Sequence, residues 1–296
     1  RLNYMVVRNG EESIKVFIPE IAVLVLESTA ISLTAALLCE LCTQGVRIVF
    51  CDGKRNPYGE LAPYYGTCDV VEKQRIQASW DRKFADRVWA EVVKHKIINQ
   101  SEVLLFNGQP DAAEMLKGYS EMVLPGDITN REGHAAKVYF NNLFGNGFTR
   151  RDDSPINAAL NYGYALLLSA VNREIAACGY STMVGIFHSN NANMFNLGSD
   201  LMEPFRPLVD EFVRSMGISD FDVEIKHRIL DVLNVVVIID GKRNYLLNAI
   251  HMQVQSFFSA MQSLDISRLL FHRAIFDEGE VHESDSVLRS ASRDQS

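Results

Sequence analysis

The spacing of apolar residues changes near residue 70, and this change limits the folds that the chain can adopt. Before Thr67, apolar residues gather in short runs separated by turn residues. Later they recur at steps of three and four over longer segments. Short runs are typical of strands, and the longer spacing is typical of helices. We therefore predict an α+β protein with a small N-terminal β domain that carries one helix (1–69), a larger all-α domain (70–276) and a polar, flexible tail (277–296).

The predicted N-terminal domain begins with a β-hairpin. Asn9-Gly10 is a strong turn signal, and it lies between two strand-like runs, Leu2 to Val7 and Ser13 to Ile18. Ser32 is expected to cap a helix over residues 33–43, because a serine hydroxyl can accept a hydrogen bond from a free amide of the first turn. Three further strands are expected over residues 21–26, 46–50 and 58–65.

The predicted second domain is built from helices. Residues 70–99 contain neither glycine nor proline and are expected to form one long helix. Ser154-Pro155 predicts the start of a helix that runs to Cys178, and its nearly uniform apolar surface places it at the centre of the bundle. The other expected elements are a helix from Arg131 to Phe144 capped by Thr129 or Asn130, a helix from about Ser199 bent at Pro207, a helix over 222–233, a hairpin at Asp240-Gly241 and a helix over 246–263.

Composition excludes some classes of protein. The formal net charge of −8 argues against a non-specific nucleic-acid binder, although it allows a local basic patch. No apolar run is long enough for a transmembrane helix, and no signal peptide is visible, so no membrane partner is expected. Five scattered cysteines indicate a reduced, cytoplasmic protein. Cys39 and Cys42 form a CxxC, which we interpret as core cysteines within a helix.

The stretch from His188 to Asp210 is rich in residues that can bind metal ions or act in catalysis. Asp200 and Glu203 are three residues apart, which places both carboxylates on one face of a helix. Two acids together need a cation or a base between them, and carboxylates with a histidine suit Mg²⁺ or Mn²⁺. The alternative is that the acids favour the helix dipole, and that Arg206 pairs with Glu203 or Asp210 in an intrahelical ladder of salt bridges. The sequence lacks glycine-rich phosphate loops, a GxSxG elbow and convincing zinc spacing.

Several long motifs resemble one known family. They are VLVLESTAISLT, RIVFCDGKRNP and LAPYY in the N-terminal part, then NREGHAAKVYFNNLFG (130–145), INAALNYGYALL (156–167), GIFHSNN (185–191) and NLGSDLMEPFRPLVD (196–210). The chain resembles the CRISPR-associated protein 1 family, the integrase and endonuclease of spacer acquisition, and its N-terminal part looks like the type II branch. The resemblance covers nearly the whole chain except the tail.

The resemblance implies a metal site and its residues. The catalytic and metal-binding residues would be Glu132 in NREGH, His188 in GIFH and Glu203 in DLMEPFRP, around one Mg²⁺ or Mn²⁺. Some branches of the family carry aspartate where Glu203 stands. Asp200 matches another acidic position and is expected to be a supporting or alternative ligand. The implied reaction is attack of a DNA 3′-hydroxyl on a phosphodiester at the edge of the CRISPR repeat.

The resemblance also implies partners. They are double-stranded DNA, a second copy of the chain bound through the β domain, and a dimer of CRISPR-associated protein 2. Residues expected to contact DNA are Arg131, Lys137, Arg150, Arg151, Arg206 and, with less reason, Lys242 and Arg243. The alternatives are a stand-alone metal-dependent nuclease and a catalytically silent DNA-binding scaffold.

Overall fold

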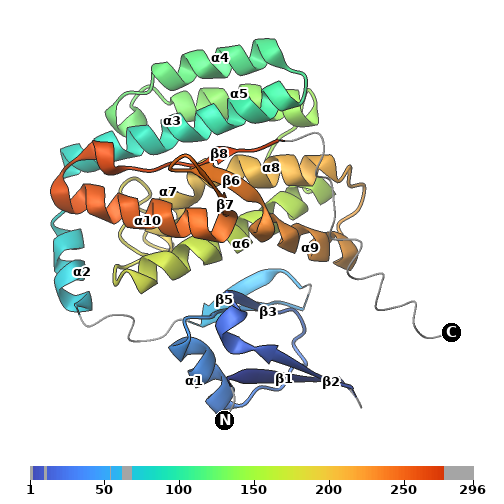
Figure 1. The fold of residues 1–296 in the computed structure, drawn as a ribbon. Helices are drawn as coiled ribbons and strands as arrows, with labels where there is room; N and C mark the ends of the chain where they lie inside the picture. Colours follow the sequence, from blue (N-terminus) through green and yellow to red (C-terminus); the bar gives the residue numbers. More distant parts are fainter. Residues whose placement is uncertain (1–2, 10–11, 54, 62–68, 277–296) are drawn as a thin grey trace.

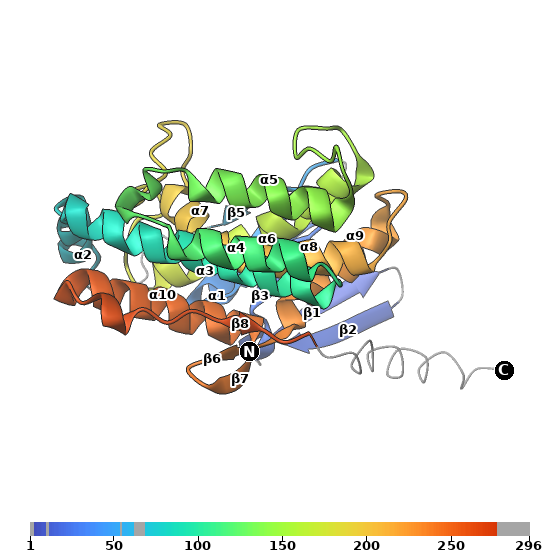
Figure 2. The same cartoon turned by 90° about the horizontal axis from the view of Figure 1, so that it is seen from above.

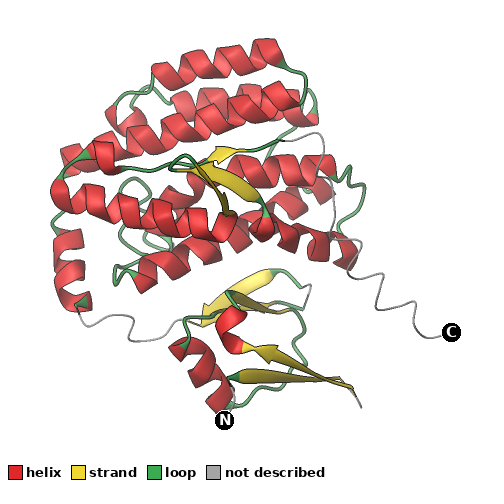
Figure 3. Cartoon of the chain, viewed as in Figure 1, coloured by secondary structure: helices red, strands yellow, loops and turns green. Residues whose placement is uncertain are grey.

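The computed structural model describes residues 3–9, 12–53, 55–61 and 69–276. Strands dominate the N-terminal part and helices dominate the remainder, so the predicted α+β class is confirmed (Figures 1 and 3). The elements are β1 (Tyr4–Asn9), β2 (Glu12–Phe17), η1 (Ile18–Glu20), β3 (Val23–Leu26), α1 (Ala35–Thr43), β4 (Arg47–Cys51), β5 (Pro57–Leu61), α2 (Val70–Ala78), α3 (Arg82–Phe106), α4 (Pro110–Glu121), η2 (Pro125–Asp127), α5 (Arg131–Phe144), α6 (Pro155–Ala177), α7 (Asn196–Met202), η3 (Glu203–Phe205), α8 (Arg206–Ser215), α9 (Val223–Leu230), η4 (Asp231–Asn234), β6 (Val236–Ile239), β7 (Lys242–Tyr245), α10 (Leu246–Ser263), η5 (Ile266–Arg268) and β8 (Arg273–Ala274).

Two small sheets make up the N-terminal part. β1 and β2 pair antiparallel, which confirms the predicted hairpin, although Gly10 of its turn lies outside the described residues. β3 and β4 run parallel, and α1 makes the crossover that parallel strands require. The helix begins two residues later than predicted, because Thr34 rather than Ser32 is its cap and accepts a hydrogen bond from the amide of Leu37. Leu41 and Ile48 are fully buried in the core of this part.

The CxxC motif does not lie wholly in the core. Cys39 is exposed on α1, so its assignment as a core cysteine is wrong, and Cys42 is half-buried. The helix is short and buries Leu41 alone, which leaves its other positions at or near the surface. Burial, followed by the nearby Cys39, raises the pKa of the Cys42 thiol. A raised pKa opposes formation of a reactive thiolate, so the motif gives no support for redox chemistry.

The predicted long helix over 70–99 is wrong, because the structure contains two helices there. α2 ends at Ala78, and Asp81 caps α3 by accepting a hydrogen bond from the Phe84 amide at 2.6 Å. Gln77 at the end of α2 donates to the carbonyls of Ser181 and Val184, which draws this turn toward a distant loop. These tertiary contacts outweigh the absence of a local helix breaker. α3 then continues to Phe106, beyond the predicted end.

The helix α6 lies at the centre of the helical part, as predicted. Its Ser154 cap and Cys178 end agree with the sequence, and both α8 and α10 pack against it (Figures 1 and 2). α7 also packs closely on α6 at Gly198, where an added Cβ would lie 2.1 Å from Oδ1 of Asn172. On its other side α6 contacts β4 and β5, and Arg173 of α6 donates to the Ala22 carbonyl. This helix therefore links the two parts of the chain.

The larger part is mostly rather than entirely helical, so the expected all-α composition needs correction. The hairpin at Asp240-Gly241 is confirmed, with both turn residues at positive φ. β8 adds a third strand on the other edge of β6 and gives the order β7-β6-β8. The backbone amides on the free edge of β6 need hydrogen-bond partners, and β8 supplies them. The sequence around β6 does not indicate which distant segment will do so. No described helix is long and apolar enough to cross a membrane. The predicted tail (277–296) lies outside the described residues.

Candidate metal and DNA site

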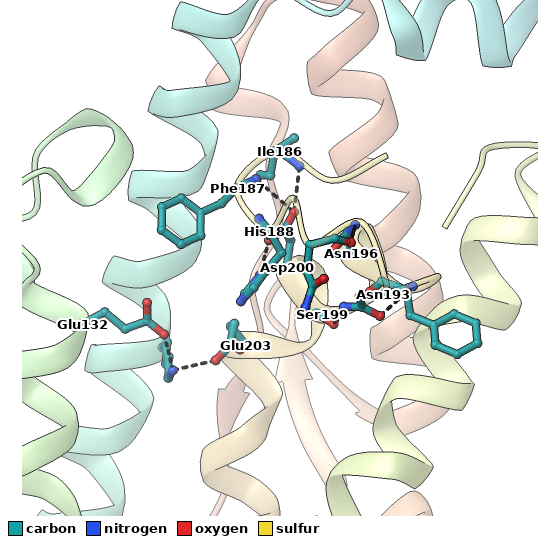
Figure 4. A network of polar contacts seen from close by, with 12 residues as sticks. Glu132, Ile186, Phe187, His188, Asn193, Asn196, Ser199, Asp200 and Glu203 are labelled. Carbon is teal, nitrogen blue, oxygen red and sulfur yellow. Dashed lines mark hydrogen bonds and ion pairs between the residues drawn. The ribbon is translucent and has the colours of Figure 1, made fainter. Parts of the chain in front are cut away.

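Glu132 is placed by the capped start of α5. Asn130 is the N-cap, one of the two predicted, and its side chain accepts a hydrogen bond from the Gly133 amide. Asp127 accepts hydrogen bonds from the amides of Arg131 and Glu132 at 2.8 and 3.0 Å. These acceptors occupy the free amides of the first turn. The Glu132 carboxylate is therefore free to point away from its own helix, toward α3 (Figure 4).

His188 is held by Asp200. Oδ1 of Asp200 lies 2.6 Å from Nδ1 of His188 and accepts the His188 amide, while Oδ2 accepts the amides of Ile186 and Phe187 (Figure 4). Asp200 is fully buried, and both of its oxygens are used. Its hydrogen bond raises the pKa of His188, against the effect of burial. Asp200 thus orders the loop and fixes the imidazole, with Nε2 on the side away from Asp200.

The loop before His188 is also fastened to α3. Phe187 stacks on the buried Trp89 with ring centroids 4.3 Å apart. Arg82 donates to the carbonyl of Ile186 at 2.8 Å. Gly185 permits the close fold of this loop, since an added Cβ would lie 2.5 Å from the His188 carbonyl and 2.6 Å from Oδ2 of Asp200. These contacts hold the loop beside the long helix α3.

Glu203 does not share one helical face with Asp200, as the sequence had suggested. α7 ends at Met202, and Glu203 lies in the 3-10 turn η3 that contains Pro204 and precedes α8. The interruption falls at Pro204 rather than at the predicted Pro207. Proline removes a backbone donor, which favours the break. The turn directs the buried Glu203 carboxylate toward α3, whereas Asp200 points to the His188 loop (Figure 4).

Two residues remote in sequence hold the η3 turn. Asn99 of α3 donates to the Pro204 carbonyl at 2.9 Å. His272, just before β8, stacks on Phe205 with centroids 4.2 Å apart and an interplanar angle of 3°. Burial, followed by His95, lowers the pKa of His272 to about 3. His272 is therefore a neutral, structural residue that helps to place Glu203.

Lys96 lies between the two glutamates. Its Nζ is 2.6 Å from Oε1 of Glu132 and 2.5 Å from Oε2 of Glu203. Arg206 is 3.0 Å from the other oxygen of Glu203, which confirms one of its two expected partners. Lys96 did not emerge from the sequence. The available signal was its position four residues after Val92, which extends the apolar stripe of α3 and so places the lysine on a buried face.

Asp210, the other partner considered for Arg206, is bonded elsewhere. Tyr164 of α6 donates to Asp210, which is completely buried. Burial raises the pKa of this carboxyl to about 6. The Arg206 guanidinium lies over the Tyr164 ring, 4.7 Å from its centroid. The Tyr164 ring, held by Asp210, therefore packs against Arg206, and the guanidinium remains paired with Glu203.

Of the candidate DNA-contacting residues, Arg206 and Arg150 are tied to this site by their contacts. Arg150 donates to Asn157 and Asn161 and lies over the Tyr164 ring, so it adjoins Arg206. Arg131 lies over the ring of Tyr119. The remaining candidates are Lys137, which lines a hollow between α4 and α5, Arg151, which is exposed, and Lys242 and Arg243, which lie on β7 in the hairpin.

The donor set around Lys96 suits a divalent ion in its chemistry, although its members do not surround one ion. Within the described residues, no three histidine, cysteine or acidic side chains lie close enough together to surround one ion. Glu132 and Glu203 nevertheless approach a common cation, the Lys96 ammonium. Oε2 of Glu203 is buried with no well-directed hydrogen bond, and His188 has its Nδ1 side taken by Asp200. Two carboxylates and an imidazole oriented by a further carboxylate are typical metal donors, so the chemistry fits.

Comparison with known proteins identifies the family. A model described as "CRISPR associated protein Cas1" matches residues 1–220. The chain is 33% identical over 274 residues to the CRISPR-associated endonuclease Cas1 of Neisseria meningitidis serogroup C (strain 8013), and the match covers 91% of this chain and 90% of that protein. This chain belongs to the Cas1 family. Glu132, His188, Asp200 and Glu203 all lie inside the range matched by the Cas1 model.

Solved structures share the Cas1 fold of the chain. One, titled "Casposase bound to integration product", has a TM-score of 0.72 at 19% identity and covers 95% of this chain and 90% of that chain. A second, titled "Cas6-RT-Cas1--Cas2 complex", has a TM-score of 0.70 at 19% identity. It covers 94% of this chain and 34% of that chain, so the Cas1 chain described here spans about a third of that longer protein.

Proposed function

We propose that this Cas1 chain is a divalent-metal-dependent DNA integrase that inserts captured DNA fragments into a CRISPR array. Its family and the name of its Neisseria relative support an enzyme that acts on DNA. The observation that carries the proposal is the approach of Glu132 and Glu203, from α5 and η3, to one buried cationic position beside His188. A catalytically silent scaffold would not need two inward-facing glutamates and an oriented imidazole around one point.

Glu132, Glu203 and Nε2 of His188 would hold the ion, either Mg²⁺ or Mn²⁺. When bound, the ion supplies positive charge that acidifies the attacking 3′-hydroxyl and offsets the charge of the scissile phosphate. Asp200 keeps the proton on Nδ1 of His188, so that Nε2 presents its lone pair. Three protein ligands leave coordination positions for DNA oxygens.

Arg206 and Arg150 are proposed to contact the DNA backbone next to this site. Arg206 is 30% exposed at its side chain while it contacts Glu203, and Arg150 lies over the same Tyr164 ring. Arginine offers several donors to phosphate oxygens. These two arginines matter for DNA binding because the chain as a whole has a formal net charge of −8, which would repel the phosphates. Arg131, Lys137 and Arg151 are proposed to extend the contact along the DNA.

The proposed assembly contains DNA, a second copy of this chain and a Cas2 dimer. One structural relative is titled as a complex that contains both Cas1 and Cas2. The β1–β2 hairpin carries exposed apolar residues that support its proposed role in the homodimer. They are Tyr4, Val6, Val7 and Ile14.

A strand-transfer assay tests the proposal. A DNA fragment with a free 3′-hydroxyl and a supercoiled plasmid that carries the repeat would be incubated with Cas2 and Mg²⁺ or Mn²⁺. Glu132→Gln, His188→Asn and Glu203→Gln are each expected to abolish transfer, while circular dichroism shows a folded protein. Lys94→Met serves as the control and is expected to retain transfer, because the Lys94 side chain is 41% exposed and pairs with Glu91 rather than with a proposed ligand. Full transfer by all three variants would contradict the assignment.

The same site would act as a nuclease if water replaced the 3′-hydroxyl. The Neisseria relative is named an endonuclease, which favours this as the second candidate. The two functions differ in their products. An integrase joins the labelled fragment to the plasmid, whereas a stand-alone nuclease shortens DNA and yields no joined product. Both functions require the same three ligands.

A further inference from the structure

The ammonium of Lys96 lies where two proposed metal ligands meet. Its distances to Glu132 and Glu203 are 2.6 and 2.5 Å, which are ion-pair contacts to both. Lys96 comes from α3, whereas the glutamates come from α5 and η3. A single point charge therefore joins three elements of the fold at the proposed metal site.

Charge balance explains why a cation is needed there. Two nearby carboxylates repel each other, and the repulsion is strong for Glu203, which is buried. Arg206 contacts Oε1 of Glu203, the oxygen that Lys96 does not contact, and so balances one of the two negative charges. Lys96 balances the other. With Lys96 in place, the two glutamates and the two basic residues sum to zero. A divalent ion gains little by approaching a group of side chains that is already neutral.

We infer that Lys96 is a resident counter-ion that the divalent metal must displace from Glu132 and Glu203. This rests on the proposed metal-dependent function and goes further, because it assigns a competing role to a residue that lies outside the ligand set. Lysine suits exchange, since its charge is a compact ammonium on a flexible stem. The stem is anchored on a buried face of α3, because Lys96 lies four residues after the buried Val92 and three after the buried Val93.

The exposure of the side chains indicates from which side the metal ion enters and the ammonium leaves. Glu132 is 24% exposed and Glu203 is 3% exposed, with Lys96 at 10%. Solvent and ions therefore reach the site past Glu132 rather than past Glu203. The ammonium can leave toward the same opening, while Arg206 stays on Glu203.

The direct test measures binding of Mn²⁺ to the DNA-free protein by electron paramagnetic resonance of the free ion. Lys96→Met removes the competitor and keeps an unbranched stem. The dissociation constant for Mn²⁺ is expected to fall at least about tenfold relative to wild type. Lys94→Met on the same helix is the control and is expected to leave the constant unchanged. Equal or weaker binding by Lys96→Met would overturn the inference and make Lys96 a permanent part of the site.

A second measurement uses wild-type protein, so it does not depend on the folding of a variant. An amine-acylating reagent followed by mass spectrometry reports how accessible each lysine is. Saturating Mn²⁺ is expected to increase acylation of Lys96 several-fold and to leave Lys94 unchanged. Unchanged labelling of Lys96 at a saturating concentration would contradict displacement.

Glu132→Gln and Glu203→Gln separate this inference from the proposed function. If both variants bind Mn²⁺ as tightly as wild type, the proposed metal site itself is wrong. If both lose binding while Lys96→Met gains none, the metal site stands and the exchange role of Lys96 is wrong.

Discussion

Oδ1 of Asp200 lies 2.6 Å from Nδ1 of His188, and the same carboxylate accepts three consecutive backbone amides, those of residues 186–188. One buried side chain thus fixes both the path of the loop and the orientation of the imidazole. This arrangement explains how an acid close to the proposed ligands in sequence can serve the site without binding the metal. It also provides a test that separates orientation from ligation.

Asp200→Asn is expected to reduce metal affinity and strand transfer by about 10- to 100-fold without abolishing them. An amide can keep one acceptor oxygen for the backbone amides, but it no longer stabilises a proton on Nδ1 of His188. The pKa of His188, which Asp200 raises, is expected to fall in this variant. Titration of the histidine signals by NMR measures that change, and an unaltered His188 pKa would contradict the orienting role.

Glu203→Ala and Glu132→Ala are expected to differ in stability. Removal of Glu203 leaves Lys96 with Glu132 as its one carboxylate partner and takes the carboxylate away from Arg206. Loss of one partner from a buried ion pair costs up to about 3–5 kcal/mol. Glu132 is more exposed, so its removal is expected to cost clearly less. Urea denaturation of both variants gives the two free energies of unfolding. A larger loss for Glu132→Ala would show that the buried charges are arranged differently.

The buried His272 is expected to make the folded protein less stable in acid. Its pKa is lowered by burial to about 3 in the folded protein, against about 6.5 when unfolded. Because the unfolded state binds the proton more readily, the contribution of His272 is complete above about pH 6.5 and falls as the pH drops toward 3. His272→Phe keeps a ring against Phe205 and removes this titration. Melting temperatures from pH 7 to 4 are therefore expected to fall less steeply in the variant.

Gly198→Ala is expected to separate α7 from α6. The added methyl group would lie 2.1 Å from Oδ1 of Asn172 and 3.0 Å from Cδ1 of Leu168, so about 1–3 kcal/mol of stability should be lost. Strand transfer should fall as well, because α7 carries Asp200. Gly118→Ala in α4 is the matched control, since its Cβ would meet no atom within 4 Å. This control is expected to be neutral or stabilising by up to about 1 kcal/mol.

The sequence alone determined the features that depend on neighbouring residues. The cap and proline at Ser154-Pro155 define the start of α6, and Asp240-Gly241 defines the late hairpin. Asn130 caps the helix that carries Glu132. Each of these signals acts within a few residues, through local hydrogen bonds and backbone preferences. The long motifs likewise indicated the Cas1 family, which the comparisons confirm.

Only the tertiary structure decided which charges meet. Lys96 is 36 residues away from Glu132, and its burial beside two glutamates follows from the packing of α3 against α5 and η3. The break between α2 and α3 depends in the same way on Gln77 and a loop about a hundred residues later. Asp200 and Glu203, neighbours in sequence, were divided between His188 and Lys96 because Pro204 interrupts the helix between α7 and α8. Contacts between distant segments compensate buried charge, and no local pattern encodes them.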